Sequence, residues 1–155
     1  MRIVYKVLAY LIAVEVAVQA AVMVYGDAGL GKWIEQGGVL DKTVMESEAS
    51  PFPEVIGLMT HGINGMMVIP VIALLLLIAS FFARVPGAVK AAGLVLLLVV
   101  LQVTLGLFGH DIPALGALHG INALLLFSAA LYAARRDRSS VSVPAQAEPR
   151  LGTAG

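Results

Sequence analysis

Two short segments of this chain place the same rare residues in the same order. Residues 61–64 read His-Gly-Ile-Asn, and residues 119–122 repeat these four residues without change. The segments contain both asparagines of the chain and two of its three histidines. Because an imidazole nitrogen can ligate a metal or carry a proton, the matched pair His61 and His119 is the first candidate for chemistry.

The residues before each segment repeat as well. Gln19 precedes Gly26 by the same number of residues as Gln102 precedes Gly109, and each pair lies before one of the His-Gly-Ile-Asn segments. The pattern predicts two related helical hairpins. Since each hairpin contains two spans, both enter a membrane in the same direction, so the repeats should be parallel.

The elements that position these residues are apolar helices. Hydrophobic residues make up 59% of the chain, charged residues 13%, and the mean hydropathy is +0.92. Apolar runs long enough to span a bilayer cover residues 7–25, 54–83, 91–108 and 115–134. Short connections make consecutive helices antiparallel. The sequence therefore predicts an all-α integral membrane protein, an up-down-up-down four-helix bundle over residues 1–137.

Charge predicts the orientation of the bundle in a cell membrane. Basic residues gather on one side of the predicted spans, which places the N- and C-termini in the cytoplasm: Arg2, Lys6, Arg84, Lys90, Arg135, Arg136 and Arg138. The outer loop, residues 26–53, contains Leu30, Trp33 and Ile34, which could form a short interfacial helix. Residues 138–155 have the composition of a disordered cytoplasmic tail. With a formal net charge of zero, nothing favours nucleic acid as a partner.

Depth and spacing give the histidine pair a specific chemistry. In such a bundle the second and fourth helices lie diagonally across the core, and His61 and His119 share one depth near the outer surface. Two imidazoles placed in this way can ligate the iron of haem b from both sides. Small residues beside them leave room for a porphyrin, or equally let helices pack closely without a cofactor: Gly62, Gly65, Gly120 and Ala123.

The other amide side chains admit two interpretations. Asn64 and Asn122 are expected to hydrogen-bond across helices and fix their packing, or else to contact a cofactor propionate. Gln19 and Gln102 serve the same packing role or accept the outer N–H of a ligating imidazole, which would fix its tautomer.

Three further residues stand apart from the repeat. Glu15 lies near the middle of the first span, where Leu98 occupies the matching place in the second hairpin. It is protonated in the bilayer, paired within the core, or active in proton transfer. His110 lies in a short outer loop and is expected to be solvated. Pro70 is expected to kink its helix below His61.

The chain resembles one four-helix half of a haem A synthase. The resemblance is carried by residues 101–106 (Leu-Gln-Val-Thr-Leu-Gly), 117–119 (Ala-Leu-His) and 123–125 (Ala-Leu-Leu), and it extends over residues 60–132. It implies that His61 and His119 are paired axial ligands on the extracytoplasmic side. The chain also looks like small uncharacterised four-helix bacterial membrane proteins.

The departures from that family concern the enzyme activity. Haem A synthases have a second half, which this chain does not match. They also commonly have an acidic residue just before the first histidine and an arginine after it. Here Met59 and Thr60 precede His61, and Gly62 follows it. The resemblance therefore supports a haem site and not the synthase reaction.

Three functions compete on these grounds. The leading one is a membrane haem b protein that passes single electrons or handles haem. The second is a proton- or cation-coupled transport component that uses Glu15 and the histidine pair. The third is a non-catalytic subunit or scaffold of a larger membrane complex. Expected partners are the lipid bilayer and a redox partner or such a complex.

Overall fold

The chain is all-helical in a computed structural model that describes residues 1–47 and 50–136. Among these residues, four helical stretches are long and apolar enough to cross a membrane: Arg2–Glu35, Val55–Phe82, Ala88–Gly109 and Pro113–Arg135. The elements are α1 (Arg2–Glu35), α2 (Lys42–Glu46), α3 (Val55–Ile63), the π-helix η1 (Asn64–Val68), α4 (Ile69–Phe82), α5 (Ala88–Gly109) and α6 (Pro113–Arg135). The predicted tail, residues 138–155, lies outside the described residues.

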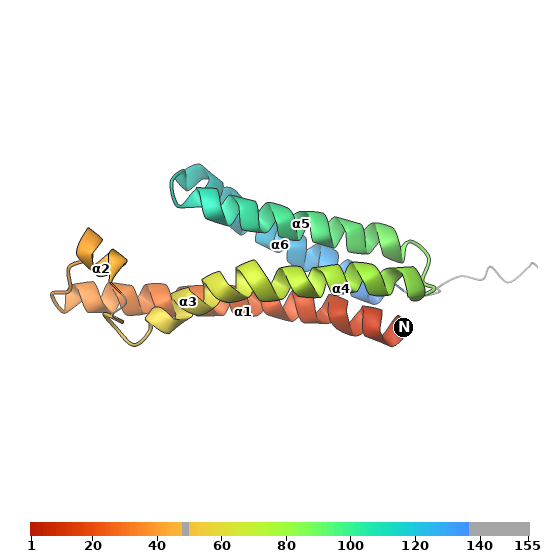
Figure 1. Ribbon diagram of the computed structural model, residues 1–155, viewed down its shortest axis with the longest axis horizontal. Coiled ribbons are helices and arrows are strands. Elements are labelled where there is room, and N and C mark those ends of the chain that lie inside the picture. The colour runs from red at the N-terminus through yellow and green to blue at the C-terminus, as the bar shows by residue number, and fades with distance from the viewer. Residues whose placement is uncertain (48–49, 137–155) are drawn as a thin grey trace, which may run out of the picture.

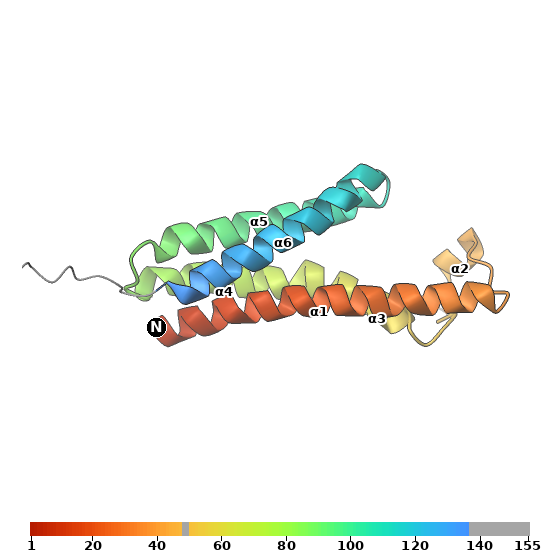
Figure 2. The same cartoon turned by 180° about the vertical axis from the view of Figure 1, so that it is seen from behind.

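The long helices lie alongside one another in an elongated bundle (Figure 1). Helix α1 packs against α3, α4 and α6, while α5 packs against α4 and α6. One end of the bundle holds Met1 and the connection from α4 to α5, and we name it the Met1 end. The opposite end holds the connection from α5 to α6 and is named the Gly109 end. Both views show α5 and α6 leaning away from α1 and α3 toward the Gly109 end (Figure 2).

Apolar packing is concentrated in the half of the bundle nearer the Met1 end. Its largest fully buried side chains come from all four long helical stretches: Tyr5, Ile12, Leu76, Val95, Val99 and Leu126. Numerous alanines fill the space between them, so the helix backbones approach closely. Beyond the level of Val99, the apolar side chains of α5 are exposed or half-buried. The two hairpins are therefore held together at one end and separate toward the other.

Helix α1 is longer than the sequence predicts. It was expected to end at Tyr25, yet it continues to Glu35 and includes the segment expected to be a separate interfacial helix. At roughly 1.5 Å per residue, its 34 residues exceed the thickness of a bilayer core. Two glycines beyond the expected end, Gly26 and Gly29, are packing positions. A Cβ on Gly26 would lie 2.7 Å from the Leu58 side chain, and one on Gly29 would meet Glu54.

A π-helical turn interrupts the second long stretch directly after His61. Pro70 has no N–H, and its ring would collide with the carbonyl of Met66 in a regular α-helix. The wider turn of η1 immediately precedes this proline, and such turns relieve this kind of conflict. The irregularity predicted at Pro70 is thus found between Asn64 and Val68.

The Met1 end is closed by Arg136. Its guanidinium donates to the Pro86 carbonyl from Nε (3.0 Å) and Nη2 (2.7 Å) and lies 5.1 Å from the centre of the Tyr132 ring. Gly87 follows Pro86 with φ of 70°, and a Cβ there would meet the guanidinium. This contact joins the end of α6 to the connection between α4 and α5.

The contact between α1 and α3 yields the first testable prediction. A Cβ on Gly57 would meet the Val22 carbonyl and lie 2.9 Å from the Gly26 nitrogen, both of them backbone atoms. We expect Gly57→Ala to destabilise the protein by about 1–3 kcal/mol, as overpacking does. Thermal unfolding in detergent, followed by circular dichroism, measures the change.

The matched control is Gly93→Ala in α5, where a Cβ would meet nothing within 4 Å. This substitution should stabilise the helix by about 0.5–1 kcal/mol. Equal stability of the two variants would contradict the close approach of α1 and α3.

Candidate functional site

The structure brings His61 and His119 together although 57 residues separate them in the chain. His61 comes from α3 and His119 from α6, and their ring centroids lie 6.1 Å apart with the planes inclined by 58°. Both side chains are half-buried. They lie on the Gly109 side of the apolar cluster. The two hairpins separate toward this end (Figure 1).

Each histidine is held by the helix that precedes it in its own hairpin. His61 Nδ1 lies 3.1 Å from the main-chain carbonyl of Gln19, and His119 Nδ1 lies 2.9 Å from that of Gln102. A carbonyl oxygen can only accept, so it favours the tautomer with the proton on Nδ1. That tautomer leaves the lone pair of Nε2 available to a ligand. Each glutamine thus contacts its histidine through its main-chain carbonyl. From the sequence, only the glutamine side chains were considered for this contact.

The Gln19 amide has one orientation that satisfies its neighbours. In it, Oε1 accepts from Gly65 N and Asn64 Nδ2, both at 3.0 Å, while Nε2 reaches His61 O at 3.1 Å and His61 Nδ1 at 2.7 Å. The second hairpin supports this orientation independently, since Asn122 Nδ2 donates to Gln102 Oε1 at 2.6 Å. The asparagine-to-glutamine contact is therefore common to both hairpins.

This orientation makes the two imidazoles inequivalent. His61 Nδ1 has a donor, the Gln19 side chain, and an acceptor, the Gln19 carbonyl, within reach. His119 Nδ1 has only the acceptor among the described residues. His119 accordingly favours one tautomer, whereas His61 can hold either.

Each asparagine side chain contacts a glutamine side chain on the preceding helix and one further acceptor. This further acceptor differs between the two hairpins. Asn122 is 3% exposed and also donates to the Leu98 carbonyl at 2.9 Å. Asn64 donates to the carboxylate of Glu15 at 2.7 Å instead. Glu15 occupies in α1 the place that Leu98 occupies in α5, so a side-chain carboxylate replaces a main-chain carbonyl as the acceptor.

The small residues divide into two groups. A Cβ on Gly62 or Gly120 would meet nothing within 4 Å, so both glycines face open space. A Cβ on Gly65 would lie 3.7 Å from the Gln19 amide, which makes Gly65 a packing position. Ala123 in α6 is half-buried. Gly106 was missed as a site residue: a Cβ there would lie 3.1 Å from the His119 ring, and its place facing His119 emerges only from the fold.

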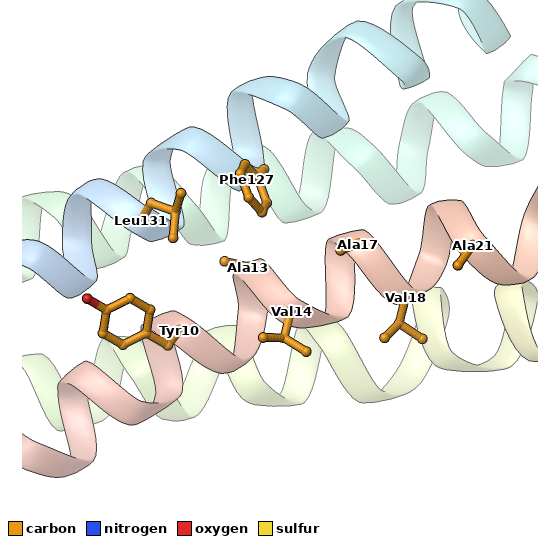
Figure 3. A pocket seen from close by; sticks show the side chains of 8 residues that line it. All are labelled: Tyr10, Ala13, Val14, Ala17, Val18, Ala21, Phe127 and Leu131. Atoms are coloured by element: carbon orange, nitrogen blue, oxygen red, sulfur yellow. The ribbon is translucent and has the colours of Figure 1, made fainter.

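Two other features lie apart from this site. The His110 side chain is 77% exposed and lies 3.4 Å from Asp111. A shallow groove between α1 and α6 is lined by apolar side chains and the Tyr10 ring (Figure 3): Tyr10, Ala13, Val14, Ala17, Val18, Ala21, Phe127 and Leu131. Neither histidine of the pair lines the groove.

Within the described parts of the chain, no group of three or more His, Cys, Asp or Glu residues is arranged to hold a metal ion. A structural zinc site usually needs four protein ligands and a catalytic one three.

Comparisons with protein families, curated proteins and solved structures found no match to this chain.

The buried Asn122 yields the second prediction. Asn122→Ala removes two interhelical hydrogen bonds and leaves the Gln102 amide oxygen without this donor, which should cost about 1–3 kcal/mol. Unfolding in detergent micelles, followed by circular dichroism, measures the loss. Leu124→Ala is the control, because Leu124 is 70% exposed on the same helix and its truncation should change stability little. An equal loss in both variants would argue against the cross-link.

Proposed function

We propose that this protein is a multi-pass membrane protein that binds haem b between His61 and His119 and serves electron transfer or haem handling. In this proposal the bundle runs up-down-up-down as two parallel hairpins, with both termini in the cytoplasm. The basic residues near the Met1 end support that orientation. The histidine pair then lies toward the extracytoplasmic face of the cell membrane.

The geometry of the two imidazoles is the observation that carries the proposal. A metal bound to one nitrogen of each ring at about 2 Å, with the rings on opposite sides, separates the ring centres by about 6 Å. The measured separation is 6.1 Å. The main-chain carbonyls of Gln19 and Gln102 support Nδ1 protonation, which leaves Nε2 of each ring able to bind a metal.

Haem fits this donor set better than a bare metal ion. The porphyrin supplies four nitrogens of its own, so two histidines complete the coordination of its iron. When bound, the haem would take up and release single electrons. A Cβ on Gly62 or Gly120 would meet no other side chain within 4 Å, so these positions impose no contact on a bound group. Ligation by His61 uses the tautomer in which Nδ1 donates to the Gln19 carbonyl.

The position of the polar groups weighs against the transport alternative. A conduction path would need polar side chains or water on both sides of Glu15. Toward the Met1 end, however, α1 continues with the buried Ile12 and Ala13, and the cluster around them is apolar. The polar contacts of Glu15 and the histidines all lie on the other side of this cluster.

Optical spectroscopy tests the haem proposal. Protein purified from a haem-sufficient host should give a reduced-minus-oxidised spectrum of six-coordinate haem b. His61→Ala and His119→Ala should each lose that spectrum, because each removes one axial ligand. His110→Ala should keep it, since His110 is exposed and distant from the pair. Folded but colourless wild-type protein would contradict the proposal.

A further inference from the structure

Among the residues that the structure describes, Glu15 is the one acidic side chain tied to the histidine pair, and the second hairpin has Leu98 in its place. Its Oε2 accepts from Asn64 Nδ2 at 2.7 Å. In the second hairpin the corresponding asparagine donates to the Leu98 carbonyl, which cannot take up a proton at neutral pH. The two hairpins thus share the histidine, asparagine and glutamine contacts and differ in one titratable group.

No positive charge faces this carboxylate among the described residues. Helices α3, η1 and α4, which pack against α1 along this stretch, contain no Lys, Arg, Asp or Glu. The other titratable groups on the elements around Glu15 are the two histidines, with Lys90, Tyr132 and Arg135 confined to the Met1 end of α5 and α6. Glu15 is thus a half-buried carboxyl group that meets an amide donor and no cation.

Hydrogen bonds connect Glu15 to His61 through Asn64 and Gln19. Asn64 Nδ2 bridges Glu15 Oε2 and Gln19 Oε1, Gln19 Nε2 donates to the His61 main-chain carbonyl at 3.1 Å, and the Gln19 main-chain carbonyl accepts from His61 Nδ1 at 3.1 Å in the ligating tautomer. A change of charge on Glu15 therefore reaches His61 through two polarisable amides rather than through apolar packing. The buried Ile12 and Ala13 separate Glu15 from the Met1 end, so its protons must exchange with water at the Gly109 end.

We propose that Glu15 is a redox-linked proton site: it binds one proton from water at the Gly109 end when one electron enters the paired-histidine centre. The inference rests on the proposed haem function. The electron comes from a one-electron reductant, and Glu15 goes from carboxylate to carboxylic acid, so the net charge of the site is unchanged. When the electron leaves, the O–H bond breaks and the proton returns to the same water.

Potentiometric titration at several pH values tests this inference. In the wild type the midpoint potential should fall as the pH rises, because proton uptake becomes less favourable and reduction loses its support. The limiting slope is about 59 mV per pH unit, the equivalent of a tenfold change for a one-electron couple. In Glu15→Gln the slope should be largely lost, although the glutamine oxygen can still accept from Asn64.

Asp27→Asn is the matched control, since it removes an exposed carboxylate from the same helix and should leave the slope unchanged. A reduced-minus-oxidised infrared spectrum gives a second readout: the C=O band of a protonated carboxyl should appear in the wild type and be absent in Glu15→Gln.

The outcomes separate this inference from the haem proposal. A haem spectrum with a pH-independent potential would overturn the role of Glu15 and leave haem binding intact. A slope that survives in Glu15→Gln would also overturn it, because the proton would then bind elsewhere. Wild-type protein that binds no haem would overturn both.

Discussion

Every polar group inside this bundle has to find its partner within the protein, because the surrounding lipid offers none. The chain meets this constraint mainly with main-chain carbonyls of neighbouring helices. The main-chain carbonyls of Gln19, Gln102 and Leu98 accept hydrogen bonds from polar side chains of the next helix in the same hairpin. Each hairpin is therefore cross-linked internally, and the two hairpins meet chiefly through apolar packing near the Met1 end.

That division explains why the candidate site lies where it does. Close packing of alanines with larger apolar side chains holds the four long helical stretches together in one half, and a cofactor could enter there only by breaking it. In the other half the hairpins lean apart (Figure 1). Each contributes one imidazole to the pair, whose ring centroids lie 6.1 Å apart. The same internal cross-links that satisfy the histidines also fix their depth and favour one tautomer of His119, so folding and the geometry of the pair depend on the same contacts.

Apolar runs and the repeat were enough to predict four membrane-spanning helices and to pair His61 with His119, because both signals are periodic along the sequence. The end of α1 was predicted wrongly. Glycines at 26 and 29 normally end a helix, and only the approach of α3 shows that they are packing positions. The use of main-chain carbonyls as acceptors was equally hidden, because every residue has one and the sequence does not distinguish them.

The differences between the two hairpins are more informative than their likeness. A pair of identical imidazole sites would be held by identical contacts, yet the first hairpin adds a carboxylate at Glu15 and a π-turn after His61. The π-turn has a local cause in Pro70. Glu15 has none, since Leu98 fills the same place in the second hairpin and its main-chain carbonyl satisfies Asn122 equally well. An ionisable side chain within a membrane span costs free energy, and at this place an apolar residue suffices in the second hairpin. The presence of Glu15 therefore favours a role in proton chemistry.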